Sequence, residues 1–323
     1  MTSIDVVIAT HNRHERLVRC LDALASQTHR EFGVIVVDDG SNPGVEAFLA
    51  ERRPRLANLR VACTGRNAGP ARARNLGVSL SHADIICFVD DDVDADSRLL
   101  ERHLSQLGDG SAHLVSIGPL LAPPDWDPSP WNRWEAEMLL DQYKKMERGV
   151  YAPSFRQFYT GNAALSRCDF ERAGGFDDRF TRAEDIELGI RLGRAGCTFA
   201  FDPAAVGWHY AHRSLASWLN IPRQYARFDR AIDGLYPEIG WLGGLESERS
   251  RRNVLSRAAG RGFTRLHAGP LVARLAVASA AALSRLNATR LATPALSLAF
   301  ELEYAHAARK LHAAGGPALP APG

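Results

Sequence analysis

This chain of 323 residues lacks the short sequences that mark several common classes of nucleotide-binding protein. It contains neither a Gly-x-Gly-x-x-Gly segment nor a Walker sequence, which argues against dinucleotide binding and P-loop chemistry. No uncharged apolar run is long enough to span a bilayer, and the N-terminus has neither the basic stretch nor the apolar core of a signal peptide. We therefore expect a cytoplasmic protein.

Cysteine is scarce, and acidic and basic residues nearly balance. The five cysteines are scattered and odd in number, without the spacing of metal-ligand or redox pairs, which fits a reducing compartment. A net charge of +2 gives no reason to expect a nucleic acid as a partner. The bulk properties are therefore those of an ordinary globular protein.

Apolar runs alternate with helical patterns over the first 120 residues. The runs are Ile4–Ala9, Phe32–Val37, Leu59–Cys63 and Ile85–Val89, and the helical patterns are Arg13–Ser26, Val45–Arg52 and Pro70–Leu80. This alternation predicts an α/β fold with a mostly parallel sheet and helices on both of its faces. Ligands of such sheets bind at the carboxyl ends of the strands. Each run ends in a polar cluster, so we expect the clusters to converge on one crevice.

Three consecutive aspartates, Asp90, Asp91 and Asp92, follow the fourth run. Like charges at the end of a buried strand repel each other, and a cation among them relieves that repulsion. Carboxylates suit Mg²⁺ or Mn²⁺, which commonly bridge a protein to phosphate oxygens. A calcium loop beginning at Asp90 is the competing interpretation, but its sixth position is Ala95 where glycine is required. The triplet therefore predicts a metal–diphosphate site.

Two further segments could contribute to such a site. Asp39 follows the second run, where it could accept from a base or a ribose, or could simply cap a turn. The helix expected after Asn67 begins at a strand end, where helix N-termini favour phosphates, and Arg72 or Arg74 could face the diphosphate.

Adjacent carboxylates stand at the start of another expected helix, in Glu184-Asp185. Acidic residues in a first helical turn often only complement the helix dipole. If this turn faces the crevice, one carboxylate could take the proton from an attacking hydroxyl.

Taken in order, these motifs resemble those of the family 2 glycosyltransferases. They are Ile8–Arg13, Val37–Ser41, Asn67–Gly77, Asp90–Asp92, Gly174–Asp177, and Glu184-Asp185 with Arg191. The segment Thr160–Leu192 is similar to the galactosyltransferase-type half of such enzymes. The resemblance implies the GT-A fold of nucleotide-diphospho-sugar transferases, a nucleotide-sugar donor, Mn²⁺ or Mg²⁺, and inversion at the anomeric carbon.

The resemblance also implies roles for individual residues. Asp185 would be the catalytic base, Glu184 would orient the acceptor, and Asp92 with Asp90 would hold the metal. Contacts with the nucleobase of the donor would come from Thr10, Asn12, Arg13 and Glu15. Other donor contacts would come from Asp39, Asn67, Gly69, Arg74, Asp90, Asp91 and Asn162. Asn162 could instead belong to a turn. His209 is a candidate metal ligand that competes with His212 and with a simple packing role.

The same resemblance divides the chain into regions. Residues 1–213 would form the catalytic domain, with a donor-binding half at 1–120 and an acceptor-binding half at 121–213. Residues 214–312 read as a helical C-terminal extension, and 313–323 as a disordered tail. The helical pattern at 271–286, with Arg274 and Arg285 in nearly one sector, could pack on the catalytic domain, bind a partner helix, mediate a homo-oligomer or lie on the inner face of a membrane.

The resulting hypothesis is an inverting, metal-dependent hexosyltransferase. Its donor would be a UDP-sugar first, or a TDP- or GDP-sugar, and its acceptor a hydroxyl of a glycan, a lipid-linked glycan or a small molecule. The setting would be bacterial polysaccharide, glycolipid or glycosylated-metabolite synthesis. The alternatives are a sugar-phosphate nucleotidyltransferase and a non-catalytic protein that binds nucleotide sugars or glycans.

Overall fold

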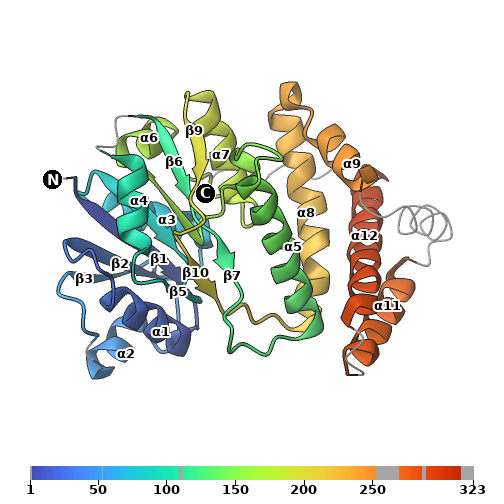
Figure 1. Cartoon of the computed structure of the whole chain (residues 1–323), viewed down its shortest axis with the longest axis horizontal. Coiled ribbons are helices and arrows are strands. Elements are labelled where there is room, and N and C mark those ends of the chain that lie inside the picture. Colours follow the sequence, from blue (N-terminus) through green and yellow to red (C-terminus); the bar gives the residue numbers. More distant parts are fainter. Residues whose placement is uncertain (1, 53, 109–111, 252–268, 286–288, 314–323) are drawn as a thin grey trace. The chain divides into compact units, whose positions relative to one another are not determined.

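The computed structural model describes residues 2–52, 54–108, 112–251, 269–285 and 289–313 (Figure 1). The chain separates into two compact units. The first unit comprises the residues up to Trp126 together with Ala136–Tyr210, and the second comprises Asp127–Glu135 and the helices after Ala211.

A seven-stranded sheet forms the centre of the first unit. Its order is β3-β2-β1-β4-β8-β6-β9, with β1 (Ile4–Thr10), β2 (Phe32–Asp38), β3 (Leu59–Cys63), β4 (Ile85–Val89), β6 (Leu114–Ile117), β8 (Asn162–Ser166) and β9 (Thr198–Phe201). Only β8 among these strands runs antiparallel to its neighbours. The four strands predicted in the first 120 residues are confirmed.

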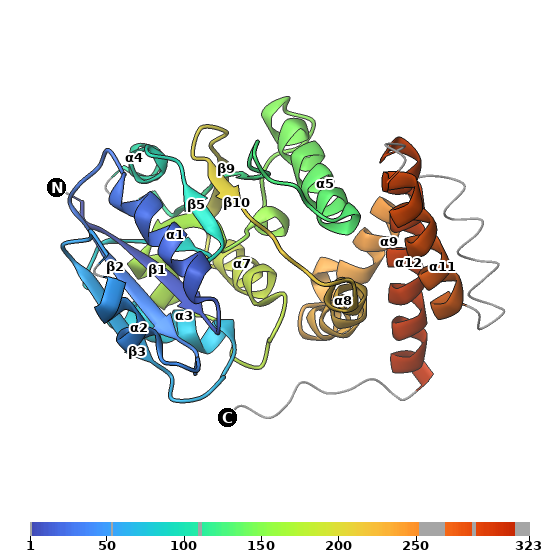
Figure 2. The same cartoon turned by 90° about the horizontal axis from the view of Figure 1, so that it is seen from below.

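Helices cover both faces of this sheet, because successive side chains on a buried strand point to opposite sides. On β1, Val6 and Ile8 belong to one core cluster and Val7 to another. The first cluster is completed by α1 (His14–Ala25), α2 (Val45–Arg52) and α4 (Leu99–Leu107), and the second by α3 (Pro70–Ser79), α6 (Arg167–Arg172) and α7 (Glu184–Arg194). Figure 2 shows α1 and α3 on opposite sides of β1.

A small second sheet explains how distant parts of the first unit meet. It contains β5 (Val93–Ala95), β10 (Gly207–His209) and β7 (Leu120–Leu121), in the order β5-β10-β7. β10 pairs antiparallel with β5, and in that register His209 stands opposite Val93. His209 is thereby brought beside the aspartate triplet, which ends immediately before β5.

The second unit is helical, as the C-terminal sequence predicts. Its helices are α8 (Leu215–Leu235), the short η2 (Pro237–Ile239), α9 (Trp241–Arg251), α11 (Gly269–Arg285) and α12 (Thr289–Ala313). The helix α5 (Pro130–Glu147) contributes its first turns to this unit, and the rest of α5 and the short η1 (Phe155–Gln157) belong to the first. Ala313 ends α12 and so is not part of a disordered tail, while 314–323 lie outside the described residues.

Buried acidic side chains tie the helices of the second unit together. Asp229 on α8 accepts hydrogen bonds from Trp241 Nε1 and Tyr304 Oη, both at 2.9 Å. Glu303 on α12 is fully buried and pairs with Arg223 of α8 at 2.7 Å. These contacts set the register of α8, α9 and α12, because an unpaired carboxylate is costly to bury.

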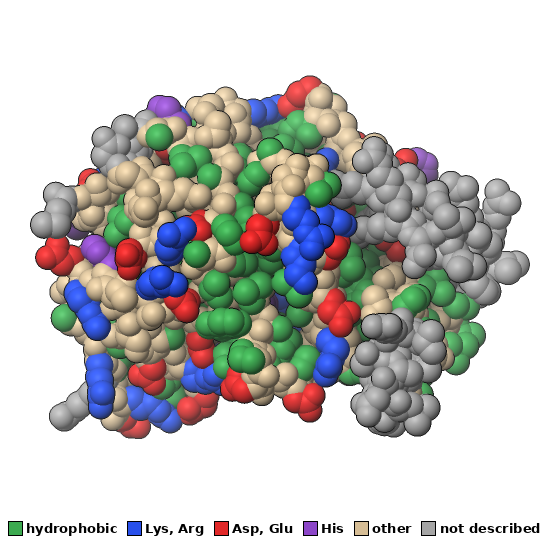
Figure 3. Space-filling model, in the orientation of Figure 1, with side chains coloured by type: hydrophobic (Ala, Val, Ile, Leu, Met, Phe, Trp, Pro, Cys, Tyr) green, Lys and Arg blue, Asp and Glu red, His purple; other side chains and the backbone are tan. Residues whose placement is uncertain are grey.

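The surface of the chain shows no dominant charge on the side that faces the viewer. In Figure 3, Lys and Arg side chains alternate with Asp and Glu side chains across this face, as expected from a net charge of +2. On α11, Leu271, Arg274 and Leu275 are exposed. Within the described parts of the chain, no helix combines the length and the apolar character needed to cross a membrane.

Gly77 lets α3 approach the sheet closely, since a Cβ there would lie 2.4 Å from Val7 Cγ1. We predict that Gly77→Ala lowers the free energy of unfolding by about 1–3 kcal/mol, because the added methyl overpacks this contact. Urea titration measures the change. Gly193→Ala on α7 is the matched control, since its Cβ would stay 3.9 Å from the nearest atom. Equal losses in both variants would contradict the packing argument.

Candidate active site

The middle aspartate of the triplet is held from β1 and from the residue before α1. Thr10 Oγ1 donates to Asp91 Oδ2 at 2.7 Å, and Arg13 Nη1 donates to Asp91 Oδ1 at 2.9 Å. Burial raises the pKa of Asp91 above its ordinary range, and Arg13 and Thr10 only partly oppose this. Thr10 and Arg13 therefore bind the aspartate triplet, whereas the sequence predicts that they contact the nucleobase of the donor.

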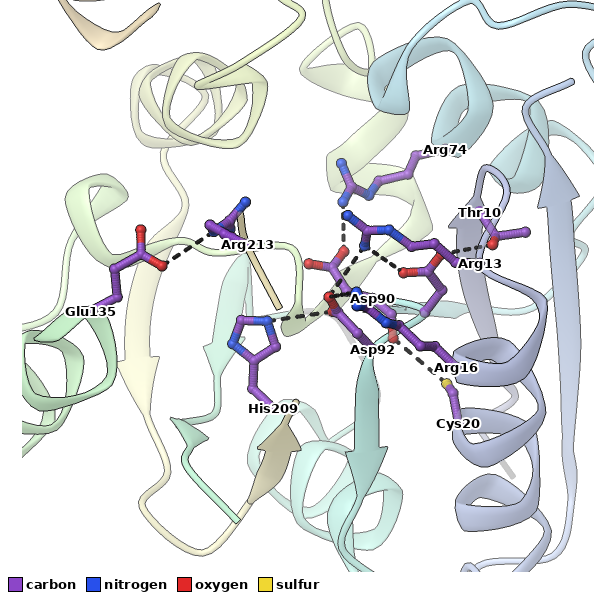
Figure 4. Close-up of polar contacts among 11 residues, drawn as sticks. Thr10, Arg13, Arg16, Cys20, Arg74, Asp90, Asp92, Glu135, His209 and Arg213 are labelled. Atoms are coloured by element: carbon purple, nitrogen blue, oxygen red, sulfur yellow. Dashed lines mark hydrogen bonds and ion pairs between the residues drawn. The ribbon is translucent and has the colours of Figure 1, made fainter. Parts of the chain in front are cut away.

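The last aspartate of the triplet has arginines beside one carboxylate oxygen and an imidazole beside the other (Figure 4). Asp92 Oδ2 lies 3.2 Å from Arg13 Nη1 and 3.7 Å from Arg16 Nη1, while Oδ1 lies 3.4 Å from His209 Nε2. Burial alone raises the pKa of Asp92, but His209, Arg13 and Arg16 outweigh it and hold that pKa well below its usual range. Asp92 is therefore an ionised carboxylate beside an imidazole.

This pair fits a divalent metal ion. Carboxylate and imidazole are both accepted ligands of Mn²⁺, and Mg²⁺ sites typically combine one or two protein carboxylates with substrate phosphates. Within the described residues, no group of three or more His, Cys, Asp or Glu side chains could hold a metal. Asp92 and His209 would therefore supply the protein ligands, and a bound diphosphate would complete the coordination. The geometry favours His209 over His212, which belongs to the second unit.

The first aspartate of the triplet is linked to the start of α7 by a buried guanidinium. Arg74 on α3 donates from Nη2 to Asp90 Oδ1 at 2.7 Å and from Nη1 to Glu184 Oε1 at 2.8 Å. Burial lowers the pKa of Arg74, but Asp90 and Glu184 outweigh it and raise that pKa, so the guanidinium stays charged. The triplet and the Glu184-Asp185 pair thus form one network. Within the Glu184-Asp185 pair, Glu184 is the residue that accepts the hydrogen bond from Arg74.

Asp185 stands next to this network in the first turn of α7. The residue before the helix, Ala183, adopts a left-handed conformation with φ of 60°, which is unfavourable for a residue with a Cβ. Burial, followed by the adjacent Glu184 carboxylate, raises the pKa of Asp185 to about 7. A carboxylate with that pKa is suited to general base catalysis near neutral pH.

A second part of the site surrounds Asp39, after β2. Its carboxylate accepts from the amides of Ala68 and Gly69 and from Thr64 Oγ1, each at 2.8 Å. Gly40 permits this closeness, because a Cβ at its φ of +76° would lie 2.6 Å from the Arg66 backbone. Asp39 therefore anchors the loop that leads into α3.

The turn-capping role that the sequence left open for Asp39 is taken by the preceding residue, Asp38. Asp38 accepts from the amides of Ser41 and Val45 at 2.7 and 2.9 Å. Asn12 joins the same turn, since its amide donates to Ser41 Oγ and its Oδ1 accepts from the Asn42 amide. Asn12 therefore lies beside the turn that follows Asp39. The nucleobase contact expected of both residues stays a prediction.

Two kinds of group predicted to bind phosphate at the start of α3 are engaged elsewhere, while Arg72, the other arginine considered, is exposed. The amides of Ala68 and Gly69 already donate to Asp39, which occupies the position of an anion. Arg74 is 6 % exposed and engaged by two carboxylates, so it does not face a diphosphate. Arg13 and Arg16, at the start of α1, contact the other two aspartates of the triplet, Asp91 and Asp92.

Two other predicted residues have contacts outside the site, and a third stays a prediction. Glu15 is exposed and pairs with Arg52 on α2 at 2.8 Å. Asn67 is exposed and precedes Ala68 in the loop that Asp39 anchors, so its donor contact stays a prediction. Asn162 is 1 % exposed. Its amide donates to the carbonyl oxygens of Pro119 and Ala205, and its Oδ1 faces His103 Nε2. The sugar contact predicted for Asn162 is therefore wrong, and the residue is structural.

Arg16 is the site residue that the sequence reasoning missed. It follows Arg13 by three residues, a spacing that places two side chains on one face at a helix start. That spacing was the available signal.

We predict a pH-dependent stability contribution from Asp185. Because its folded pKa is raised, the fold favours the protonated form, and this contribution is lost as pH rises from about 4 towards 7. The free energy of unfolding of Asp185→Asn, relative to that of the wild type, should therefore rise by about 3–4 kcal/mol over that range. Urea titrations of both proteins from pH 4 to 8 measure it. A constant difference between the two curves would contradict the assignment.

Comparison with known proteins identifies the family of the chain. Residues 5–174, more than half of the chain, match the model described as "Glycosyl transferase family 2". The chain is 29 % identical over 286 residues to validoxylamine A glucosyltransferase of Streptomyces hygroscopicus subsp. limoneus, covering 77 % of this chain and 62 % of that protein. It is 27 % identical over 275 residues to the amylovoran biosynthesis glycosyltransferase AmsB of Erwinia amylovora, covering 80 % and 82 %.

Two solved structures share the fold. A mannosyltransferase of Pyrobaculum calidifontis, solved with GDP-Man and Mn²⁺, aligns with a TM-score of 0.62 at 20 % identity, covering 96 % of this chain and 86 % of that one. S. aureus TarS 1–349, solved with UDP, aligns with a TM-score of 0.55 at 17 % identity, covering 97 % and 92 %. The galactosyltransferase-type character of 160–192 stays a prediction. The α/β sheet, the site network and the family match agree, and the chain belongs to the family 2 glycosyltransferases.

Proposed function

We propose that the protein is a metal-dependent, inverting glycosyltransferase that moves a sugar from a nucleoside-diphosphate donor to a hydroxyl acceptor. The observation that carries this proposal is the Arg74 bridge between Asp90 and Glu184. Asp90 belongs to the triplet suited to a metal–diphosphate. Glu184 is adjacent to Asp185, the carboxylate suited to act as the base. The inverting transfer proposed here uses the triplet to stabilise the departing diphosphate and Asp185 to take the proton of the acceptor hydroxyl.

In this proposal Asp185 acts directly on the acceptor. Its carboxylate takes the proton from the acceptor hydroxyl, whose oxygen forms the new bond to the anomeric carbon. The bond between that carbon and the diphosphate oxygen breaks, and the nucleoside diphosphate leaves with the electron pair. One displacement with one base inverts the configuration of the anomeric carbon.

The other site residues would hold the metal ion and the donor, and Glu184 would not act as the base. Asp92 and His209 would hold Mn²⁺ or Mg²⁺, which would neutralise charge developing on the departing diphosphate. Glu184 is held by Arg74, so it fixes the first turn of α7 and leaves Asp185 as the base. Asp39 and Asn12 would form the end of the site that receives the nucleoside.

A UDP-sugar is the first donor to test, followed by TDP- and GDP-sugars. The named relatives act on validoxylamine A or in amylovoran biosynthesis, so both small molecules and growing glycans are reasonable acceptor classes. The chain spans 62 % of the length of the first of those relatives. Thermal shift with Mn²⁺ across the donor panel would select the nucleotide.

We predict that Asp185→Asn keeps donor binding and lowers transfer at least about 100-fold, since a general base typically contributes that much. The amide has nearly the shape of the carboxylate but cannot take the proton. Donor affinity is measured by calorimetry and transfer by sugar-labelled product.

Asp141→Asn serves as the control for this test. Asp141 is an exposed residue of α5 that pairs with Lys145, and its substitution should leave transfer unchanged. Full transfer by Asp185→Asn would remove Asp185 as the base. Loss of donor binding in that variant would point to a structural defect.

The pH dependence of transfer should report the same group. With the pKa of Asp185 at about 7, we expect kcat/KM for the acceptor to fall about tenfold per pH unit below that value and to level off above it. Initial rates at saturating donor between pH 5.5 and 8.5 measure this profile. A flat profile over the range, with donor binding intact, would contradict the role of Asp185.

A further inference from the structure

Two arginines stand at the positive end of α1. Arg13 directly precedes the helix and Arg16 lies in its first turn, and no side chain caps this end. Cationic residues are unfavourable at a helix N-terminus, because the helix dipole carries positive charge there. Both arginines face the aspartate triplet, so the positive end of the helix and two guanidinium groups act on the same small region (Figure 4).

The two arginines are bound to different degrees. Arg13 donates to Asp91 at 2.9 Å and to Asp92 at 3.2 Å, which fixes it between two carboxylates. Arg16 reaches the same Asp92 Oδ2 only at 3.7 Å, which is an ion pair longer than a hydrogen bond. Both side chains are partly exposed, at 43 % for Arg13 and 31 % for Arg16. Because Arg16 makes only the longer contact with the triplet, its guanidinium can turn to a second anion while the hydrogen bonds of Arg13 keep that residue in place.

The two oxygens of the Asp92 carboxylate face different groups. Oδ2 faces the arginines, and Oδ1 faces His209 at 3.4 Å. A divalent ion held by Oδ1 and His209 would therefore lie one carboxylate away from two like charges. At such short range each like charge weakens binding of a divalent ion appreciably even in a watery environment. A diphosphate between the ion and the arginines would turn this repulsion into attraction.

We propose that Arg16 is a diphosphate-binding residue that makes cation binding depend on the nucleotide. Without nucleotide, Arg16 opposes a divalent cation at Asp92. With a nucleoside diphosphate present, Arg16 pairs with its phosphate oxygens, and cation and nucleotide bind cooperatively. The inference rests on the proposed metal-dependent function and adds a residue and a binding order to it: the cation enters together with the diphosphate.

Such coupling must be reciprocal. If the nucleotide strengthens cation binding by some factor, the cation strengthens nucleotide binding by the same factor. Because Arg16 would repel the cation and attract the diphosphate, its removal should strengthen the binding of Mn²⁺ alone and weaken the binding of UDP in the presence of Mn²⁺. A residue that merely supports the fold would weaken both.

The test measures Mn²⁺ binding directly, from the free Mn²⁺ signal in electron paramagnetic resonance, with and without saturating UDP. In Arg16→Gln we expect Mn²⁺ alone to bind about tenfold more tightly, since removing one like charge near a divalent ion has about this effect. Calorimetry should show UDP binding about tenfold more weakly in the presence of Mn²⁺. The coupling factor between the two ligands should shrink accordingly.

Two further variants control the charge and the position. Arg16→Lys keeps the positive charge and should keep the weak binding of Mn²⁺ alone. Arg52→Gln removes an arginine from α2 that pairs with the exposed Glu15 and not with the triplet, and should leave both affinities within about twofold, as expected for a solvent-screened charge. Circular dichroism confirms that each variant is folded.

Two results would overturn the inference. Unchanged Mn²⁺ affinity in Arg16→Gln, with normal coupling to UDP, would show that Arg16 does not act on the cation. Equal weakening of Mn²⁺ and UDP would assign Arg16 a structural role. Failure of the wild type to bind Mn²⁺ with UDP, GDP or TDP would instead remove the proposed metal site itself, and is read from the wild type alone.

Discussion

The site depends on one buried guanidinium. Arg74, carried by α3, holds Asp90 at the end of β4 and Glu184 at the start of α7. A buried arginine needs carboxylate partners, and carboxylates crowded at a strand end need a cation, so each group makes the burial of the others tolerable. Through this charge balance, Asp185 is held at a fixed place beside the triplet.

The rest of the site follows from strand direction and register. Parallel strands bring Thr10, Asp39 and the triplet to one edge of the sheet. The antiparallel pairing of β10 with β5 then places His209 beside Asp92 from the opposite direction. Donor groups and the base thus come from separate elements that meet only in the folded chain. Substitutions that shift β10 should accordingly affect the metal before they affect the base.

Strand and helix patterns predicted the architecture well, because apolar periodicity reports burial directly. The sequence also pointed to the triplet, Asp185 and His209, whose roles stay predictions. It did not reveal how polar groups pair, since that depends on three-dimensional contacts: Asp39 takes the amides expected to bind phosphate, and Arg74 turns inward. Asn162 looked like a sugar contact because of its motif, yet its amide is used by Pro119 and Ala205.

One measurement tests the central claim most directly: a crystal structure of the protein with Mn²⁺ and UDP. The account predicts Mn²⁺ bound by Asp92 and His209, with Arg74 still joining Asp90 to Glu184 and Asp185 open to the acceptor side. Arg74 turned away from Glu184 and bonded to the diphosphate, or Mn²⁺ bound without Asp92, would contradict it.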